Sequence, residues 1–114
     1  MSSTAIDLVT FEELKQMSGA DFIDELIDTF LEDAPKLIGD LKSSLKAGDA
    51  DAFRRAAHSL KSNGATFGAR HFAELARHLE MIGKESRLGD TGDHIQELET
   101  AFTAVARELK GLQG

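Results

Sequence analysis

The chain has 114 residues, with 13 Lys and Arg, 20 Asp and Glu and no Cys, which gives a formal net charge of −7. Its length and its hydrophobic share of 41% are enough for one buried core, so residues 1–114 are expected to form a single domain. The acidic balance argues against general binding of nucleic acids, which requires clustered Lys and Arg. The absence of Cys excludes disulfides, thiolate catalysis and Cys-ligated zinc.

Two further features bear on location. No apolar run approaches the ~20 residues that a membrane-spanning helix needs. The start, Met1 to Thr4, lacks the basic region and apolar stretch of a secretory signal. We therefore expect a cytoplasmic protein that does not bind a membrane.

The first half of the chain predicts a short helix followed by a long one. Residues 10–13, T-F-E-E, have the spacing of a capping box, so a short helix is expected from Thr10 to about Met17. Over residues 21–47 the apolar side chains fall on one helical stripe: Ile23, Leu26, Ile27, Phe30, Ala34, Leu37, Ile38, Leu41 and Leu45. Pro35 should kink or locally break this helix, and Gly48 should end it.

The second half predicts three more helices. One begins after Asp49, a good N-cap, and has an apolar seam at Phe53, Ala57, Leu60, Gly64 and Phe67. The others cover about residues 69–82 and 93–112, and the glycine-rich stretch 83–92 is expected to be a loop. Because no segment alternates with period two, we predict an all-α protein. Its expected architecture is an up-down four-helix bundle with a short extra N-terminal helix.

His58 is the strongest candidate for a functional residue. It lies one position off the apolar seam, so its imidazole should project into water at the side of the bundle. The positions three and four residues away share that face and hold Arg54, Arg55, Lys61 and Ser62. Nearby cations favour the neutral, nucleophilic imidazole and stabilise an attached phosphoryl group. With small neighbours such as Ala65, the ring should be open to a macromolecular partner, which indicates a phosphoryl carrier.

A longer motif supports this interpretation. The stretch from Ala56 to Ala69, A-A-H-S-L-K-S-N-G-A-T-F-G-A, resembles the motif of histidine-containing phosphotransfer (HPt) domains, H-x-L-K-G followed by small residues and a Gly. The matching residues are His58, Leu60, Lys61, Gly68 and Ala69. Phe30 to Leu41, with its Pro, is also similar to the family. The resemblance covers residues 21–79 well and the last helix only in general character. Ser62 stands where the family usually has Gly, and Gly64 where it usually has Ser or Ala.

The resemblance implies a function and a set of site residues. His58 would be phosphorylated, through Nε2, and Lys61 would lie near the phosphoryl group. Glu80 falls where relatives place a polar residue close to the histidine, so it could orient the ring but would oppose the phosphoryl charge. The implied partners are receiver domains of response regulators and a sensor or hybrid histidine kinase, with Mg²⁺ held by the receiver. The chain itself would be a monomeric carrier without cofactor, nucleotide site or kinase activity, consistent with the absence of a Walker-type loop.

Two other readings stay open on the sequence alone. The bundle could be a docking module whose His58 is silent. It could also bind a metal, since His71 and His78 share a helix face with Glu74 between them, although metal-binding helices more often use spacings of three or four. Otherwise His71, His78 and His94 are expected to be solvated or capping side chains.

The expected docking surface is an apolar patch beside His58. By helix phase its candidates are Ala57, Ala65, Phe67, Phe11 and Leu14, with core burial the favoured reading for Phe67.

Overall fold

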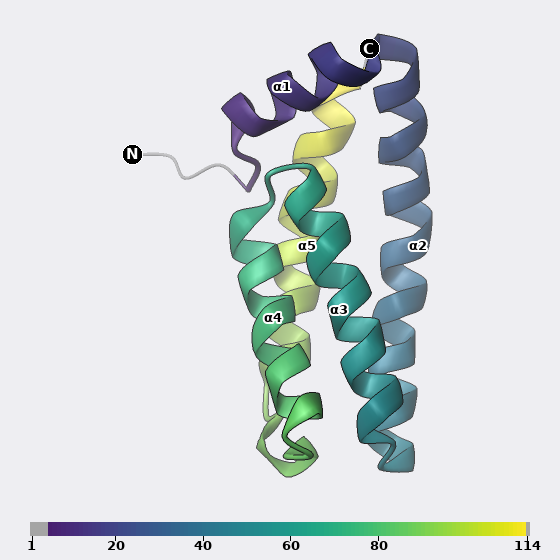
Figure 1. The fold of residues 1–114 in the computed structure, drawn as a ribbon, viewed down its shortest axis with the longest axis vertical. Helices are drawn as coiled ribbons and strands as arrows, with labels where there is room; N and C mark the ends of the chain where they lie inside the picture. The colour runs from purple at the N-terminus through teal and green to yellow at the C-terminus, as the bar shows by residue number, and fades with distance from the viewer. Residues whose placement is uncertain (1–4, 114) are drawn as a thin grey trace.

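The computed structural model describes residues 5–113, and this part of the chain is helical without any strand (Figure 1). Its elements are α1 (Leu8–Ser18), α2 (Ala20–Ala47), α3 (Ala50–Thr66), α4 (Arg70–Lys84), the 3₁₀ helix η1 (Leu88–Asp90) and α5 (His94–Leu112). Residues 1–4, where the sequence shows no secretory signal, and Gly114 lie outside the described residues. No helix within residues 5–113 is long and apolar enough to cross a membrane.

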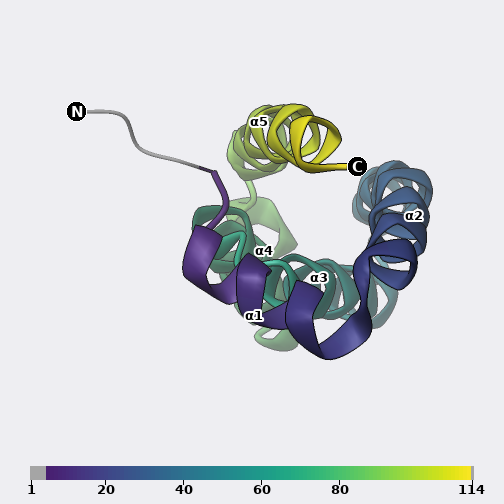
Figure 2. The same cartoon turned by 90° about the horizontal axis from the view of Figure 1, so that it is seen from above.

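The four long helices run alternately up and down, and α1 lies across one end of them (Figure 1). Seen from above, α2, α3, α4 and α5 surround a common interior, and α1 crosses over α3 and α4 (Figure 2). The predicted all-α bundle with an extra N-terminal helix is therefore confirmed.

The predicted apolar stripes form the core. The seam of α3 is buried along its whole length, and α2, α4 and α5 bury their own stripes against it. Near the end that α1 covers, the ring of Phe30 contacts Phe67, Phe72 and Phe102 at centroid distances of 5.4, 5.9 and 5.7 Å. These contacts join α2 to the segment after α3, to α4 and to α5. Each aromatic pair stabilises the fold beyond the contribution from buried apolar area.

Several helix boundaries agree with the sequence. Gly48 ends α2 in the left-handed conformation, with φ of 70°. Asp49 caps α3, its carboxylate accepting the backbone N–H of Ala52 at 3.1 Å.

Three expectations about boundaries are wrong. The capping box at Thr10 is not used, because α1 begins at Leu8 with Asp7 as its cap; the Asp7 carboxylate accepts the N–H of Val9 at 3.0 Å. Pro35 does not break α2, which continues through it. The proline is exposed, so water can satisfy the carbonyl that lacks an N–H donor. The stretch 83–92 is only partly a loop, since α4 extends to Lys84 and η1 follows.

Helices α3 and α4 approach each other closely at two glycines. A Cβ on Gly64 would lie 2.5 Å from a ring carbon of Phe72, and a Cβ on Gly83 would lie 2.9 Å from the backbone nitrogen of Arg54. Glycine generally weakens a helix, but at position 64 it makes room for the ring of Phe72. Gly83 lets the two backbones pack together one turn away from the site described below.

The first prediction follows from this packing. Gly83→Ala should destabilise the fold by about 1–3 kcal/mol, although Ala favours helices, because the new methyl group meets a backbone that cannot move independently. Gly39→Ala, on the exposed side of α2 with no atom within 4 Å of the new Cβ, should stabilise it by about 0.5–1 kcal/mol. Urea unfolding of both variants measures whether each substitution lowers or raises the free energy of unfolding. A Gly83→Ala variant as stable as the parent would show that α3 and α4 are not in close contact there.

Candidate functional site

The imidazole of His58 projects from the middle of α3 into solvent. Its neighbours Ala57 and Leu60 are fully buried, whereas the His58 side chain is 55% exposed. The seam of α3 thus anchors the helix in the core and turns His58 outward.

Glu80 of α4 binds both functional candidates of α3. Its Oε2 lies 2.8 Å from Nδ1 of His58, and its Oε1 lies 2.8 Å from Nζ of Lys61. Since His58 and Lys61 are three residues apart on one helix, a single carboxylate can reach both. The Glu80 side chain is 16% exposed, so this contact is more shielded from water than most surface ion pairs.

The charge on Glu80 sets the proton position on His58. Desolvation by burial acts to raise the pKa of Glu80, but the hydrogen bonds from Lys61 and His58 outweigh it, and the pKa lies below its usual value. An ionised carboxylate only accepts hydrogen bonds, so Nδ1 of His58 donates to it. In the neutral ring, Nε2 then carries the free electron pair and can act as a nucleophile.

Arg54 and Arg55, which were predicted to lie beside His58, pair with another residue of α3. Nη2 of Arg54 and Nε of Arg55 lie 3.0 and 3.1 Å from the carboxylate oxygens of Asp51. Asp51 precedes both by about one turn of α3, so local pairing draws the guanidinium groups away from the imidazole. Lys61 is the only one of the three predicted cations that shares a partner with His58 in the described part of the chain.

The remaining predicted residues of the site divide into exposed and buried ones. Ser62 and Ala65 are exposed and continue the His58 face of α3 by one and two turns. Ala57, Phe67 and Phe11 are only 0, 3 and 1% exposed, so the expectation that they form a docking patch is wrong, while the favoured core reading of Phe67 is right. Leu14 is half-buried against the core.

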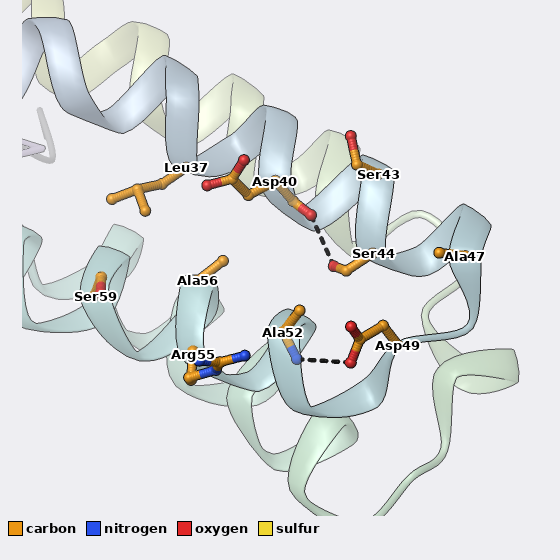
Figure 3. Close-up of a pocket in the computed structure, with 10 residues that line it drawn as sticks. All are labelled: Leu37, Asp40, Ser43, Ser44, Ala47, Asp49, Ala52, Arg55, Ala56 and Ser59. Atoms are coloured by element: carbon orange, nitrogen blue, oxygen red, sulfur yellow. Dashed lines mark hydrogen bonds between the residues drawn. The ribbon is translucent and has the colours of Figure 1, made fainter.

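A groove between α2 and α3 adds residues that sequence reasoning missed. One hollow is lined by His58, Ser59, Ser62 and Asn63 of α3 and by Asp33, Lys36 and Leu37 of α2. It shares Leu37 and Ser59 with a larger groove of about 490 Å³, which has small residues such as Ala52 and Ala56 along α3 (Figure 3). Asp33 and Lys36 flank the apolar stripe of α2. The apolar stripe of α2 shows which side of the helix is buried, but it does not show which helix lies beside Asp33 and Lys36.

The other histidines have different surroundings. The rings of His78 and His94 have centroids 4.7 Å apart and planes tilted by 31°, and Nδ1 of His94 is 2.9 Å from Oε1 of Glu97. Glu74 pairs with Arg77 and not with His71 or His78. Among residues 5–113, no group of three or more His, Cys, Asp or Glu side chains is placed to hold a metal ion.

The fold and the site together define a class of protein: an up-down helical bundle that exposes a hydrogen-bonded histidine on a middle helix. The family model described as Hpt domain matches residues 25–108, and the chain belongs to this family. It is similar to the phosphorelay protein LuxU of Vibrio harveyi, with 28% identity over 98 residues that make up 86% of each chain. It is also similar to histidine-containing phosphotransfer protein B (HptB) of Pseudomonas aeruginosa PAO1. That crystal structure has a TM-score of 0.90 and 28% identity, covering 98% of this chain and 96% of that one. Family and relatives support a role in phosphotransfer.

The second prediction concerns Glu80 and pH. The pKa of Glu80 is lowered in the folded chain from its usual value of 4.5. As the pH falls below 4.5, the unfolded chain therefore binds more protons than the folded chain, and the stabilisation provided by the ionised Glu80 is lost. Glu80→Gln should therefore be less stable than the parent at about pH 6, and the difference should shrink toward about pH 3. The measurement is urea unfolding across this range, with the exposed Glu13→Gln as the control. A difference for Glu80→Gln that stays constant with pH would contradict the assigned ionisation.

Proposed function

We propose that this chain carries a phosphoryl group on Nε2 of His58 between receiver-domain aspartates of a phosphorelay. The observation that carries the proposal is the hydrogen bond from Nδ1 of His58 to Glu80, with the imidazole still exposed. It leaves Nε2 as the nucleophile, on a surface that a partner can reach.

The transfer step needs no proton movement on the ring. The electron pair of Nε2 attacks the phosphorus of an aspartyl phosphate, the N–P bond forms, and the P–O bond to the aspartate breaks. The released carboxylate takes the electron pair, while Nδ1 keeps its proton. The ring gains positive charge, which the Glu80 carboxylate at 2.8 Å stabilises. Reversal of the same steps returns the phosphoryl group to an acceptor aspartate.

Lys61 provides positive charge beside the phosphoryl group. Its ammonium lies 2.8 Å from Glu80, and its flexible stem allows it to turn from the carboxylate to the phosphoryl oxygens. Because His58 and Lys61 share Glu80, the lysine also offsets the repulsion between that carboxylate and the phosphoryl group. Arg54 and Arg55 can join only by leaving Asp51.

The proposed partners supply the remaining chemistry. They are response-regulator receiver domains, which hold Mg²⁺ with their own acidic residues, and a sensor or hybrid histidine kinase upstream. In this scheme the chain acts as a monomeric cytoplasmic carrier that needs no cofactor or nucleotide site of its own. The similarity to the phosphorelay protein LuxU supports a role of this chain within such a relay.

The groove between α2 and α3 is the surface on which we place the receiver. It begins at the hollow that contains His58 and continues along Leu37, Ala52 and Ala56 (Figure 3). A partner that reaches Nε2 must also cover the surface beside it. The small and apolar side chains there allow close approach of a partner, while Asp40, Asp49 and Arg55 place charges along the same groove.

The third prediction tests the proposal. His58→Gln should abolish labelling by a phosphorylated receiver domain, while the free energy of unfolding stays within about 0.5 kcal/mol of the parent because the side chain is exposed. The measurement is transfer of an acid-labile, base-stable label, with circular dichroism as the control for folding. His78→Gln, at another exposed histidine, should label like the parent. Label that persists in His58→Gln would show that another residue is the acceptor, and a parent that no receiver labels would favour a docking module with a silent histidine.

A further inference from the structure

The hollow beside His58 contains a lysine from a different helix. We propose that Lys36 of α2 binds the phosphoryl group on Nε2 of His58, as a second cation besides Lys61. The inference rests on the proposed function, because it names a further residue of the same site. Lys36 and His58 line one hollow between α2 and α3, although they are 22 positions apart in the sequence.

The orientation of the imidazole decides which side the phosphoryl group occupies. Nδ1 lies on one edge of the ring and Nε2 with Cδ2 forms the other. Because Nδ1 is bound to Glu80 on α4, Nε2 lies on the side of the ring away from that carboxylate, and His58 also lines the hollow that α2 borders. A phosphoryl group on Nε2 therefore projects outward on the side of Lys36.

Lys61 approaches from the opposite edge. Its ammonium is bound to Glu80, on the Nδ1 side, and must leave that carboxylate to reach the phosphoryl oxygens. Lys36 is exposed and has no ion pair with another residue of the described chain. Its ammonium can thus move to the doubly negative phosphoryl group without breaking an existing contact.

Asp33 is the opposing charge in the same hollow. It lies one turn before Lys36 on α2 and lines the hollow with it. Its carboxylate repels a phosphoryl group, so Lys36 both attracts that group and compensates Asp33. Removal of Lys36 leaves the negative charge of Asp33 uncompensated and should lower the amount of phosphorylated His58. Removal of the Asp33 charge should raise it.

The experiment compares two lysines of α2. The parent, Lys36→Ala and Lys46→Ala are incubated with a receiver domain that has been phosphorylated with acetyl phosphate and Mg²⁺, and the label is followed to equilibrium. Lys46 is exposed on the same helix, about 15 Å farther along it, so its removal makes the same change in net charge. Lys36→Ala should shift the equilibrium away from phosphorylated His58 by about fivefold, the upper range for an exposed charge pair. Lys46→Ala should match the parent.

Three further readouts separate phosphoryl binding from a structural role. Lys36→Arg should recover most of the parent label, and Asp33→Asn should raise it. The effect of Lys36→Ala should decrease at about 1 M salt, where the screening length falls to ~3 Å. Equal label on the parent, Lys36→Ala and Lys46→Ala would overturn the inference and leave the proposed function intact. A parent that takes no label from any receiver would overturn the proposed function itself.

Discussion

The Glu80 carboxylate connects α4 to two side chains of α3, and the chemistry of the site depends on this one contact. It holds the proton of His58 on Nδ1 and keeps Lys61 beside the ring, at 2.8 Å from each. Without an ionised acceptor at this position, nothing in the described structure would select one imidazole nitrogen over the other. In the proposed transfer, this carboxylate lies on the edge of the ring opposite Nε2, where it would stabilise the charged ring and lie away from the phosphoryl group.

The packing of α3 against α4 makes this contact possible. At Gly83 the backbone of α4 approaches Arg54 so closely that a Cβ would collide, and Glu80 lies one turn before Gly83. On α3, the fully buried Leu60 and Ala57 fix the rotation of the helix, so the adjacent His58 faces Glu80 at the rim of the core. The acid, the imidazole and the lysine are thus positioned by backbone packing and not by a flexible loop. α2 completes the surroundings of the histidine by lining the hollow on its other side.

The sequence predicted most of the fold because apolar periodicity reports burial directly. The stripes on four helices, the cap at Asp49 and the exposed position of His58 all follow from spacing.

Features that depend on which helices lie side by side were harder to predict from the sequence. The contact of Glu80 with His58 could be suspected only from resemblance, and Lys36 was missed because the stripe of α2 does not identify its neighbour. Arg54 and Arg55 were placed beside His58 by helix phase, but Asp51 shares that face and pairs with both. Phe11 and Ala57 were assigned to a surface that tertiary packing buries.

The most direct test of the central claim is the tautomer of His58 in the neutral form. Nitrogen-15 NMR of histidine-labelled protein above neutral pH distinguishes a protonated ring nitrogen from one with a free electron pair. The structure predicts that His58 carries its proton on Nδ1 and that this preference weakens in Glu80→Ala. After phosphorylation, the same spectra should place the phosphorus on Nε2. A parent protein whose neutral His58 carries its proton mainly on Nε2, or whose phosphoryl group is bound to Nδ1, would contradict the assigned role of Glu80.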